Sequence, residues 1–245
     1  MAMQWQRDEH VMLGECFFAD DYVAEEVRDF ISPANTDNLL LWGLPGTGKS
    51  TVVKAIAFGR YEATDLEELG VTILNCKDKE QAKRLNSKSL KSRFNFAFLN
   101  SDCPILIIDE LDELTDAQQR ELTAFIDFSS SGKLRSMVLA TTNVDLRDRK
   151  ASAKAFSAAL LSRFNTKLEM RQLKPARFLP LAQRKLSAAG VSFDETALLD
   201  VLTQHCDSTS TTIDFRTVQT VINKLIRRSA QPPKKPPSKP SLQLV

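Results

Sequence analysis

The sequence has few of the residues that build disulfide scaffolds or structural zinc sites. Its 245 residues include only four cysteines and two histidines, and no two cysteines form a C-x-x-C pair. These residues are Cys16, Cys76, Cys103, Cys206, His10 and His205. Because structural zinc is held by four such ligands, usually in closely spaced pairs, the pattern argues against a zinc site. We expect free thiols, buried or half-buried, in a reducing compartment.

An excess of charge of one sign is also missing, as are long apolar runs. Lys and Arg number 33 against 31 Asp and Glu, so the formal net charge is only +2 and predicts no class of partner. No apolar stretch approaches the roughly 20 residues that span a bilayer. The first nine residues lack the apolar core of a secretory signal. We therefore expect a soluble, cytoplasmic protein with no membrane contact.

Short apolar runs alternate with segments of helical periodicity. The runs lie at 38–42, 71–74, 105–108, 137–141 and 166–170, and the predicted helices at 22–31, 48–58, 80–99, 116–128 and 152–162. This alternation predicts an α/β fold, with a parallel sheet flanked by helices.

After residue 170 the predicted elements are all helical, at 175–189, 194–205 and 214–228. We expect four parts: an N-terminal segment (1–37) that contributes to an adenine pocket, a nucleotide-binding core (38–170), a small all-α lid (171–230) and a tail (231–245). The tail reads Gln-Pro-Pro-Lys-Lys-Pro-Pro-Ser-Lys-Pro at its start, so we expect it to be disordered. It serves either to dock a partner or only to keep the chain soluble.

A glycine-rich segment between the first apolar run and the following helix matches the P-loop pattern G-x-x-x-x-G-K-[ST]. Backbone N–H groups of such a loop surround phosphate oxygens, Lys49 reaches the β- and γ-phosphates, and Ser50 binds Mg²⁺. The residues expected to bind the nucleotide are Gly43, Leu44, Pro45, Gly46, Thr47, Gly48, Lys49, Ser50, Thr51 and Asp109. The alternative is a chance match, or a glycine turn that serves only the fold.

Polar side chains follow two of the buried runs. Asp109 and Glu110 come directly after the run at 105–108, where a parallel sheet keeps its ligands. We expect Asp109 to hold Mg²⁺ and Glu110 to orient or deprotonate the attacking water. Asn143 ends the fourth run and can bridge water and γ-phosphate. The alternatives are an exposed acid at a helix start for Glu110 and a turn former for Asn143. Asp112 and Glu113 are expected in a solvated loop.

With these motifs, the chain resembles the AAA+ ATPases over roughly residues 11–229. Two further segments carry the resemblance, Leu-Leu-Ser-Arg-Phe at 160–164 and Ile-Asp-Phe-Arg at 213–216. The resemblance implies ATP and Mg²⁺ as cofactors. It also implies that Arg163 reaches the γ-phosphate of a neighbouring subunit and that Arg216 contacts phosphate in its own subunit. The alternatives are a surface arginine at a helix end for Arg163, and a solvated residue or a partner of Asp214 for Arg216. Rival candidates for the role of Arg163 are Arg147, Arg149 and Lys150.

Among AAA+ proteins the chain is most similar to clamp-loader ATPase subunits of DNA replication. The similarity implies an oligomer that hydrolyses ATP at subunit interfaces to load or remodel a sliding clamp or another replication protein on DNA. The chain lacks the helical collar that usually follows the lid, and the N-terminal Tyr-Arg-Pro signature. Alternative functions are an ATP-dependent adaptor of the helicase-loader or transposition-regulator type, and a monomeric P-loop kinase.

Seven basic residues fall within seventeen positions, against only two acidic ones. They are Lys77, Lys79, Lys83, Arg84, Lys88, Lys91 and Arg93. Similar helices in clamp loaders follow the backbone of a duplex. Such contacts are largely independent of sequence and weaken with salt, so we expect a DNA-binding surface here. The alternative is a solvated helix face.

Overall fold

The computed structural model describes residues 12–61, 70–97, 103–131, 135–206 and 211–229. The chain divides into two compact units, Met1–Leu173 and Lys174–Val245. The Pro/Lys tail predicted at 231–245 lies outside the described residues.

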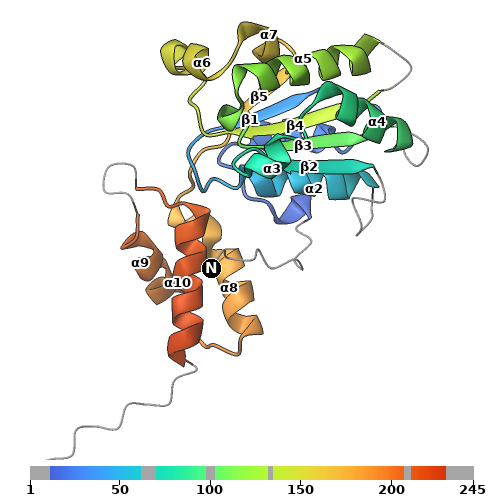
Figure 1. The fold of residues 1–245 in the computed structure, drawn as a ribbon. Helices are drawn as coiled ribbons and strands as arrows, with labels where there is room; N and C mark the ends of the chain where they lie inside the picture. The colour runs from blue at the N-terminus through green and yellow to red at the C-terminus, as the bar shows by residue number, and fades with distance from the viewer. Residues whose placement is uncertain (1–11, 62–69, 98–102, 132–134, 207–210, 230–245) are drawn as a thin grey trace, which may run out of the picture. The chain divides into compact units, whose positions relative to one another are not determined.

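The first unit is built on a five-stranded sheet with the strand order β2-β3-β4-β1-β5 (Figure 1). The strands are β1 (Leu39–Trp42), β2 (Val71–Asn75), β3 (Ile105–Asp109), β4 (Met137–Thr142) and β5 (Thr166–Glu169). All neighbouring strands pair in parallel, so the carboxyl ends of β1, β3 and β4 meet at one edge. The predicted α/β fold is confirmed.

Helices cover both faces of this sheet because successive side chains of a buried strand point to opposite faces. Leu39 and Leu41 of β1 belong to one core cluster with α1 (Asp21–Asp29) and α2 (Lys49–Tyr61). Leu40 belongs to the other cluster, with α4 (Ser87–Ala97), α5 (Asp116–Ser131) and α7 (Ala158–Leu161). Figure 1 shows α2 on one side of the sheet, with α4, α5 and α7 on the other.

The segment predicted as one helix at 80–99 is two helices, α3 (Lys79–Ala82) and α4. Asp78 caps α3 by accepting from the backbone N–H groups of Glu80 and Gln81. Asn86 accepts from the N–H groups of Lys88 and Ser89 at the start of α4. A side chain that satisfies free N–H groups starts a new helix, so the single-helix prediction was wrong between 83 and 86.

The predicted helix at 152–162 is also divided, into α6 (Arg149–Ala155) and α7. The Ser157 hydroxyl accepts from the Leu160 N–H at 3.2 Å and caps α7. Phe156 between the two helices is extended and buried. The helix therefore breaks where the Phe156 ring is buried, and the helical periodicity of the sequence does not reveal this break.

The second unit is all-α, and its helical character is as predicted. Its elements are η3 (Pro175–Phe178), α8 (Leu179–Ala188), α9 (Glu195–Thr203) and α10 (Phe215–Ser229). Asp194 caps α9 by accepting from the Ala197 N–H at 2.8 Å. The buried side chains include Phe178, Leu181, Leu186, Leu198, Leu202, Ile213, Val218 and Ile222. In the described part of the chain, helices long and apolar enough to cross a membrane are not found.

The four cysteines, which all lie in described segments, form no disulfide bonds. Cys76 and Cys103 are buried, and Cys16 and Cys206 are half-buried, as expected. Burial, with a smaller contribution from the Asp109 carboxylate, raises the pKa of the Cys76 thiol to about 12. These cysteines therefore behave as small core residues.

Candidate nucleotide-binding and catalytic site

The glycine-rich loop joins the end of β1 to the start of α2. Gly43, Gly46 and Gly48 all have positive φ values, of 139°, 79° and 91°. A Cβ atom on Gly43 would lie 2.2 Å from the carbonyl oxygen of Met170, so the loop and the end of β5 approach too closely for a side chain. These glycines let the backbone turn at the N-terminus of α2, where anions are favoured.

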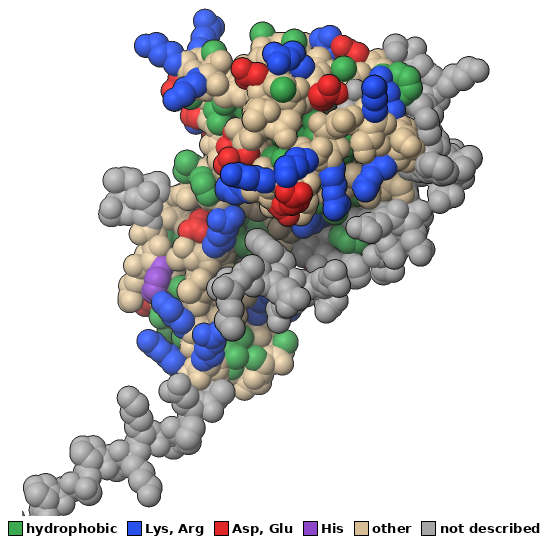
Figure 2. Space-filling model, in the orientation of Figure 1, with side chains coloured by type: hydrophobic (Ala, Val, Ile, Leu, Met, Phe, Trp, Pro, Cys, Tyr) green, Lys and Arg blue, Asp and Glu red, His purple; other side chains and the backbone are tan. Residues whose placement is uncertain are grey.

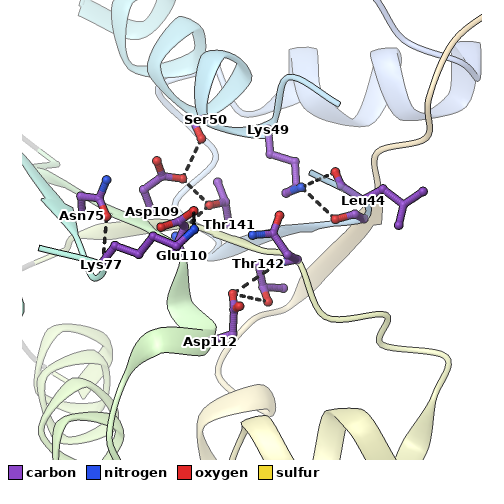
Figure 3. Close-up of polar contacts among 12 residues, drawn as sticks. Leu44, Lys49, Ser50, Asn75, Lys77, Asp109, Glu110, Asp112, Thr141 and Thr142 are labelled. Atoms are coloured by element: carbon purple, nitrogen blue, oxygen red, sulfur yellow. Dashed lines mark hydrogen bonds and ion pairs between the residues drawn. The ribbon is translucent and has the colours of Figure 1, made fainter. Parts of the chain in front are cut away.

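Lys49 is buried at the end of this loop, where it is the first residue of α2. Its ammonium group donates hydrogen bonds to the carbonyl oxygens of Gly43 and Leu44, both at 2.8 Å (Figure 3). These oxygens belong to neutral peptide groups, so they orient the ammonium without cancelling its charge. The loop thus holds a positive charge beside the turn that is predicted to receive phosphate.

Ser50 and Asp109, the two predicted Mg²⁺ ligands, are brought together. The Ser50 hydroxyl donates to Asp109 Oδ1 at 2.7 Å, and Thr141 Oγ1 donates to the same oxygen at 2.5 Å. A hydroxyl and a carboxylate are hard oxygen donors, and Mg²⁺ commonly takes one or two such protein ligands with water and phosphate oxygens. The donor set therefore fits Mg²⁺.

Glu110 lies directly after β3 in a left-handed conformation, with φ 61° and ψ 57°. Its N–H donates to Thr141 Oγ1 at 3.1 Å, which holds this uncommon conformation in place. The side chain is 14% exposed, so Glu110 is not a solvated surface acid. Its Oε2 atom is buried and has no hydrogen-bond partner among the described residues. A carboxylate oxygen of this kind can accept a proton from water.

The other oxygen of Glu110 forms an ion pair with Lys77 (Figure 3). Lys77 follows β2, and its backbone N–H donates to Asn75 Oδ1 at 2.9 Å. Asn75 lies opposite Asp109 in the β2–β3 register, so the segments after the two strands are neighbours. The hydrogen bond to Glu110 raises the pKa of Lys77, which therefore stays charged. Sequence reasoning placed these two residues in separate sites and missed the pair.

The expectation of a solvated loop is wrong for Asp112, whereas Glu113 is exposed. Asp112 lies half-buried in the turn η2 (Leu111–Glu113). Its Oδ1 accepts from the Thr142 hydroxyl at 2.8 Å and from the Asn143 N–H at 3.3 Å. Asn143 is thus fixed beside the segment that carries Asp109 and Glu110. The contact follows from the parallel pairing of β3 with β4.

Arg163 follows α7, and its polar contacts lie away from the loop. Its Nε and Nη2 atoms contact the two Asp127 oxygens of α5 at 2.5 and 3.1 Å, and Nη1 donates to Ser162 Oγ at 2.8 Å. The Arg163 side chain is 38% exposed. The hydrogen bond from Arg163 lowers the pKa of Asp127. The guanidinium is therefore oriented at the surface of its own chain.

The rival candidate Arg147 is held by Asp145 and Glu169 and lies over the Trp42 ring. Arg149 and Lys150 are exposed at the start of α6.

Arg216 is exposed on α10 in the second unit. The Asp214 carboxylate accepts from the Thr217 N–H and hydroxyl at 3.0 and 2.5 Å, so it caps α10. The role of Arg216 stays a prediction.

The seven basic residues lie after β2, on α3, in the break between α3 and α4, and on α4. Figure 2 shows Lys and Arg side chains gathered on the face where Figure 1 places these helices, with acidic side chains among them. Lys83 pairs with Glu80 at 2.5 Å, and the Lys91 ammonium lies 4.3 Å from the centre of the Phe128 ring. Lys77 is the member of this run that also contacts the candidate catalytic residue.

The model of the AAA family, the ATPase family associated with various cellular activities, matches residues 39–172. The chain belongs to this family. It is 28% identical over 119 residues to the replication factor C small subunit of Aeropyrum pernix, covering 45% of this chain and 33% of that protein. It is 31% identical over 114 residues to replication factor C subunit 2 of Saccharomyces cerevisiae, covering 41% of this chain and 31% of that protein. These matches span about a third of the length of the curated relatives.

Solved AAA+ structures share the fold of the chain. The replication initiator DnaA bound to AMPPCP and single-stranded DNA aligns with a TM-score of 0.63 at 18% identity, over 91% of this chain and 66% of that one. The Thermotoga maritima RuvB Holliday junction branch migration motor aligns with a TM-score of 0.61 at 20% identity, over 89% and 63% of the two chains.

Proposed function

We propose that the chain is an ATP hydrolase whose turnover is controlled by DNA through Lys77. The observation that carries this proposal is the position of Glu110. One of its oxygens is buried and has no hydrogen-bond partner within the described ranges, and the other is paired with a lysine from the basic run. The same carboxylate thus connects the nucleotide site with the predicted DNA surface.

In this proposal the loop from Gly43 to Ser50 binds the phosphates through backbone N–H groups, and Lys49 contacts the β- and γ-phosphates. The Ser50 hydroxyl and the Asp109 carboxylate would hold Mg²⁺, which would supply positive charge to the phosphate oxygens. Glu110 orients water and accepts its proton, and the Asn143 amide contacts water and γ-phosphate. Arg163 of a second copy supplies the remaining positive charge, so a complete site needs an oligomer.

Lys77 restrains Glu110 when DNA is absent. The ion pair occupies one carboxylate oxygen of Glu110 and directs that oxygen toward Lys77. Lys77 is 56% exposed, so a DNA phosphate can reach its ammonium group. In this proposal the phosphate draws Lys77 away and leaves Glu110 able to act.

The relatives support a role in DNA replication. The two curated relatives described above are replication factor C subunits, and one solved structure with the same fold is a replication initiator bound to single-stranded DNA. We propose a clamp-loader-like function, in which an oligomer loads or remodels a sliding clamp or another replication protein on DNA. The DNA contacts are made to the backbone by the seven basic residues and are independent of sequence.

The test compares steady-state ATP turnover of the wild type, Lys77→Ala and Lys154→Ala, with and without primed duplex DNA. Lys154 is an exposed lysine on α6, outside the basic run, and serves as the charge-matched control. We expect Lys77→Ala to show a raised rate without DNA and little further stimulation by DNA, while Lys154→Ala behaves like the wild type. A Lys77→Ala variant with a low rate and normal stimulation by DNA would contradict the proposal.

A further inference from the structure

Two threonines at the end of β4 form hydrogen bonds to the segment 109–112. One bonds to the first residue of that segment and the other bonds to the last. Thr141 and Thr142 are fully buried. The Thr141 hydroxyl donates to Asp109, and the Thr142 hydroxyl donates to Asp112 (Figure 3). Valine fills the volume of a buried threonine without a polar group that must be satisfied. The hydroxyl groups of Thr141 and Thr142 therefore serve to bind the carboxylates of Asp109 and Asp112, rather than only to fill the core.

This arrangement fixes the backbone on both sides of Asn143. The Asn143 N–H donates to Asp112 Oδ1 at 3.3 Å. The next N–H, of Val144, donates to Thr142 Oγ1 at 3.1 Å, and that hydroxyl donates in turn to Asp112. A single carboxylate oxygen thus receives both the Asn143 N–H and the hydroxyl that holds Val144. These hydrogen bonds restrict the backbone of Asn143 and therefore the position from which its side chain extends.

The same segment sets the position of Glu110. Its N–H is held by Thr141, its conformation is left-handed, and η2, with Asp112, follows at once. Asn143 and Glu110 are therefore attached to one rigid connection between β3 and β4. Small displacements of reacting groups lower rates strongly, so such a connection matters most where two side chains must meet one water molecule.

We propose that Asp112 is a positioning residue for ATP hydrolysis, which acts by holding Asn143 in register with Glu110. This inference rests on the proposed function, because it assigns Asp112 a role only in that reaction. Asp112 itself contacts neither nucleotide nor water in this scheme.

The experiment measures kcat, the Kd for ATP and the unfolding midpoint of Asp112→Ala, Asp112→Asn and the neighbouring control Glu113→Ala. Glu113 is exposed in the same turn. We expect Asp112→Ala to lower kcat by roughly 10- to 100-fold while the Kd for ATP stays within about twofold. Asp112→Asn should recover most of the rate, because its amide oxygen accepts the same two hydrogen bonds. Glu113→Ala should match the wild type.

A double-mutant cycle with Asn143→Ala separates positioning from a general structural role. If Asp112 acts through Asn143, the rate of Asp112→Ala/Asn143→Ala should equal that of Asn143→Ala. Losses that multiply, or an Asp112→Ala rate equal to the wild type, would overturn the inference. If Asp112→Ala does not fold, Thr142→Val replaces it in the cycle with the same two outcomes. Full activity of Glu110→Gln and Asn143→Ala would instead refute the proposed function itself.

Discussion

Arg163 and Asp127 form a two-point ion pair on the surface of one chain, with Nε and Nη2 each facing one carboxylate oxygen. This geometry orients a guanidinium that the proposed mechanism assigns to the nucleotide of a second copy. Both side chains are in partial contact with water, with 38% and 50% exposure. The pair thus directs Arg163 more than it stabilises the fold.

The first prediction concerns Arg163→Ala and Asp127→Ala. Because the pair is solvated and screened, both variants should have unfolding midpoints close to that of the wild type, at low and at high salt. Arg163→Ala should nevertheless lower ATP turnover about 10³-fold, since an arginine that stabilises transferred phosphate is typically worth that much. Thermal unfolding and steady-state turnover measure the two effects. A strongly destabilised Arg163→Ala would show that the side chain serves its own fold.

The second prediction concerns Asn38, which is buried at the start of β1. Its Nδ2 donates to the Arg163 carbonyl at 3.0 Å, and its Oδ1 accepts from the Val138 N–H at 2.8 Å. Asn38→Ala leaves both backbone groups without these partners and should lower the free energy of unfolding by about 1–3 kcal/mol. Urea denaturation measures it.

The control for Asn38 is Asn165→Ala. Asn165 is exposed, and its Nδ2 donates to Asp37 Oδ1 at 2.8 Å. Asn165→Ala should change the free energy of unfolding by less than about 0.5 kcal/mol. Equal effects of the two substitutions would contradict the special role of Asn38.

The third prediction concerns Gly43. Gly43→Ala places a Cβ atom 2.2 Å from the Met170 carbonyl oxygen at a φ of 139°, so the loop must move. We expect weaker ATP binding together with a loss of about 1–3 kcal/mol from backbone strain. Calorimetric titration with ATP and thermal unfolding test this. Gly14→Ala, whose Cβ would meet no atom of the described segments within 4 Å, should leave both quantities near the wild-type values. Normal ATP affinity of Gly43→Ala would contradict the account of the loop.

The sequence predicted those features that depend on local pattern. Buried parallel strands are continuous apolar runs, so the run at 105–108 located β3, and the polar residues after it marked the edge of the sheet. The P-loop pattern located the turn from β1 into α2 in the same way. The helix breaks at 83–86 and at Phe156 were missed, because a helical period continues through residues whose caps divide it.

The contacts that join the site depend on register and packing. Lys77 meets Glu110 because β2 and β3 pair in parallel with Asn75 opposite Asp109, and no spacing along the chain contains that information. Asp112 meets Thr142 through the β3–β4 pairing, and Arg163 meets Asp127 through the packing of α7 on α5. The sequence therefore identifies the candidate site residues, but only the fold shows which side chains they contact.

The most direct test of the account mixes two inactive variants, Arg163→Ala and Glu110→Gln, and measures ATP turnover. In the mixture, an Arg163→Ala chain keeps its own Glu110 and can receive Arg163 from a Glu110→Gln neighbour. If Arg163 completes the site of a second copy, random assembly of equal amounts should restore about a quarter of the wild-type turnover through head-to-tail interfaces. A mixture as inactive as the separate variants would contradict the account.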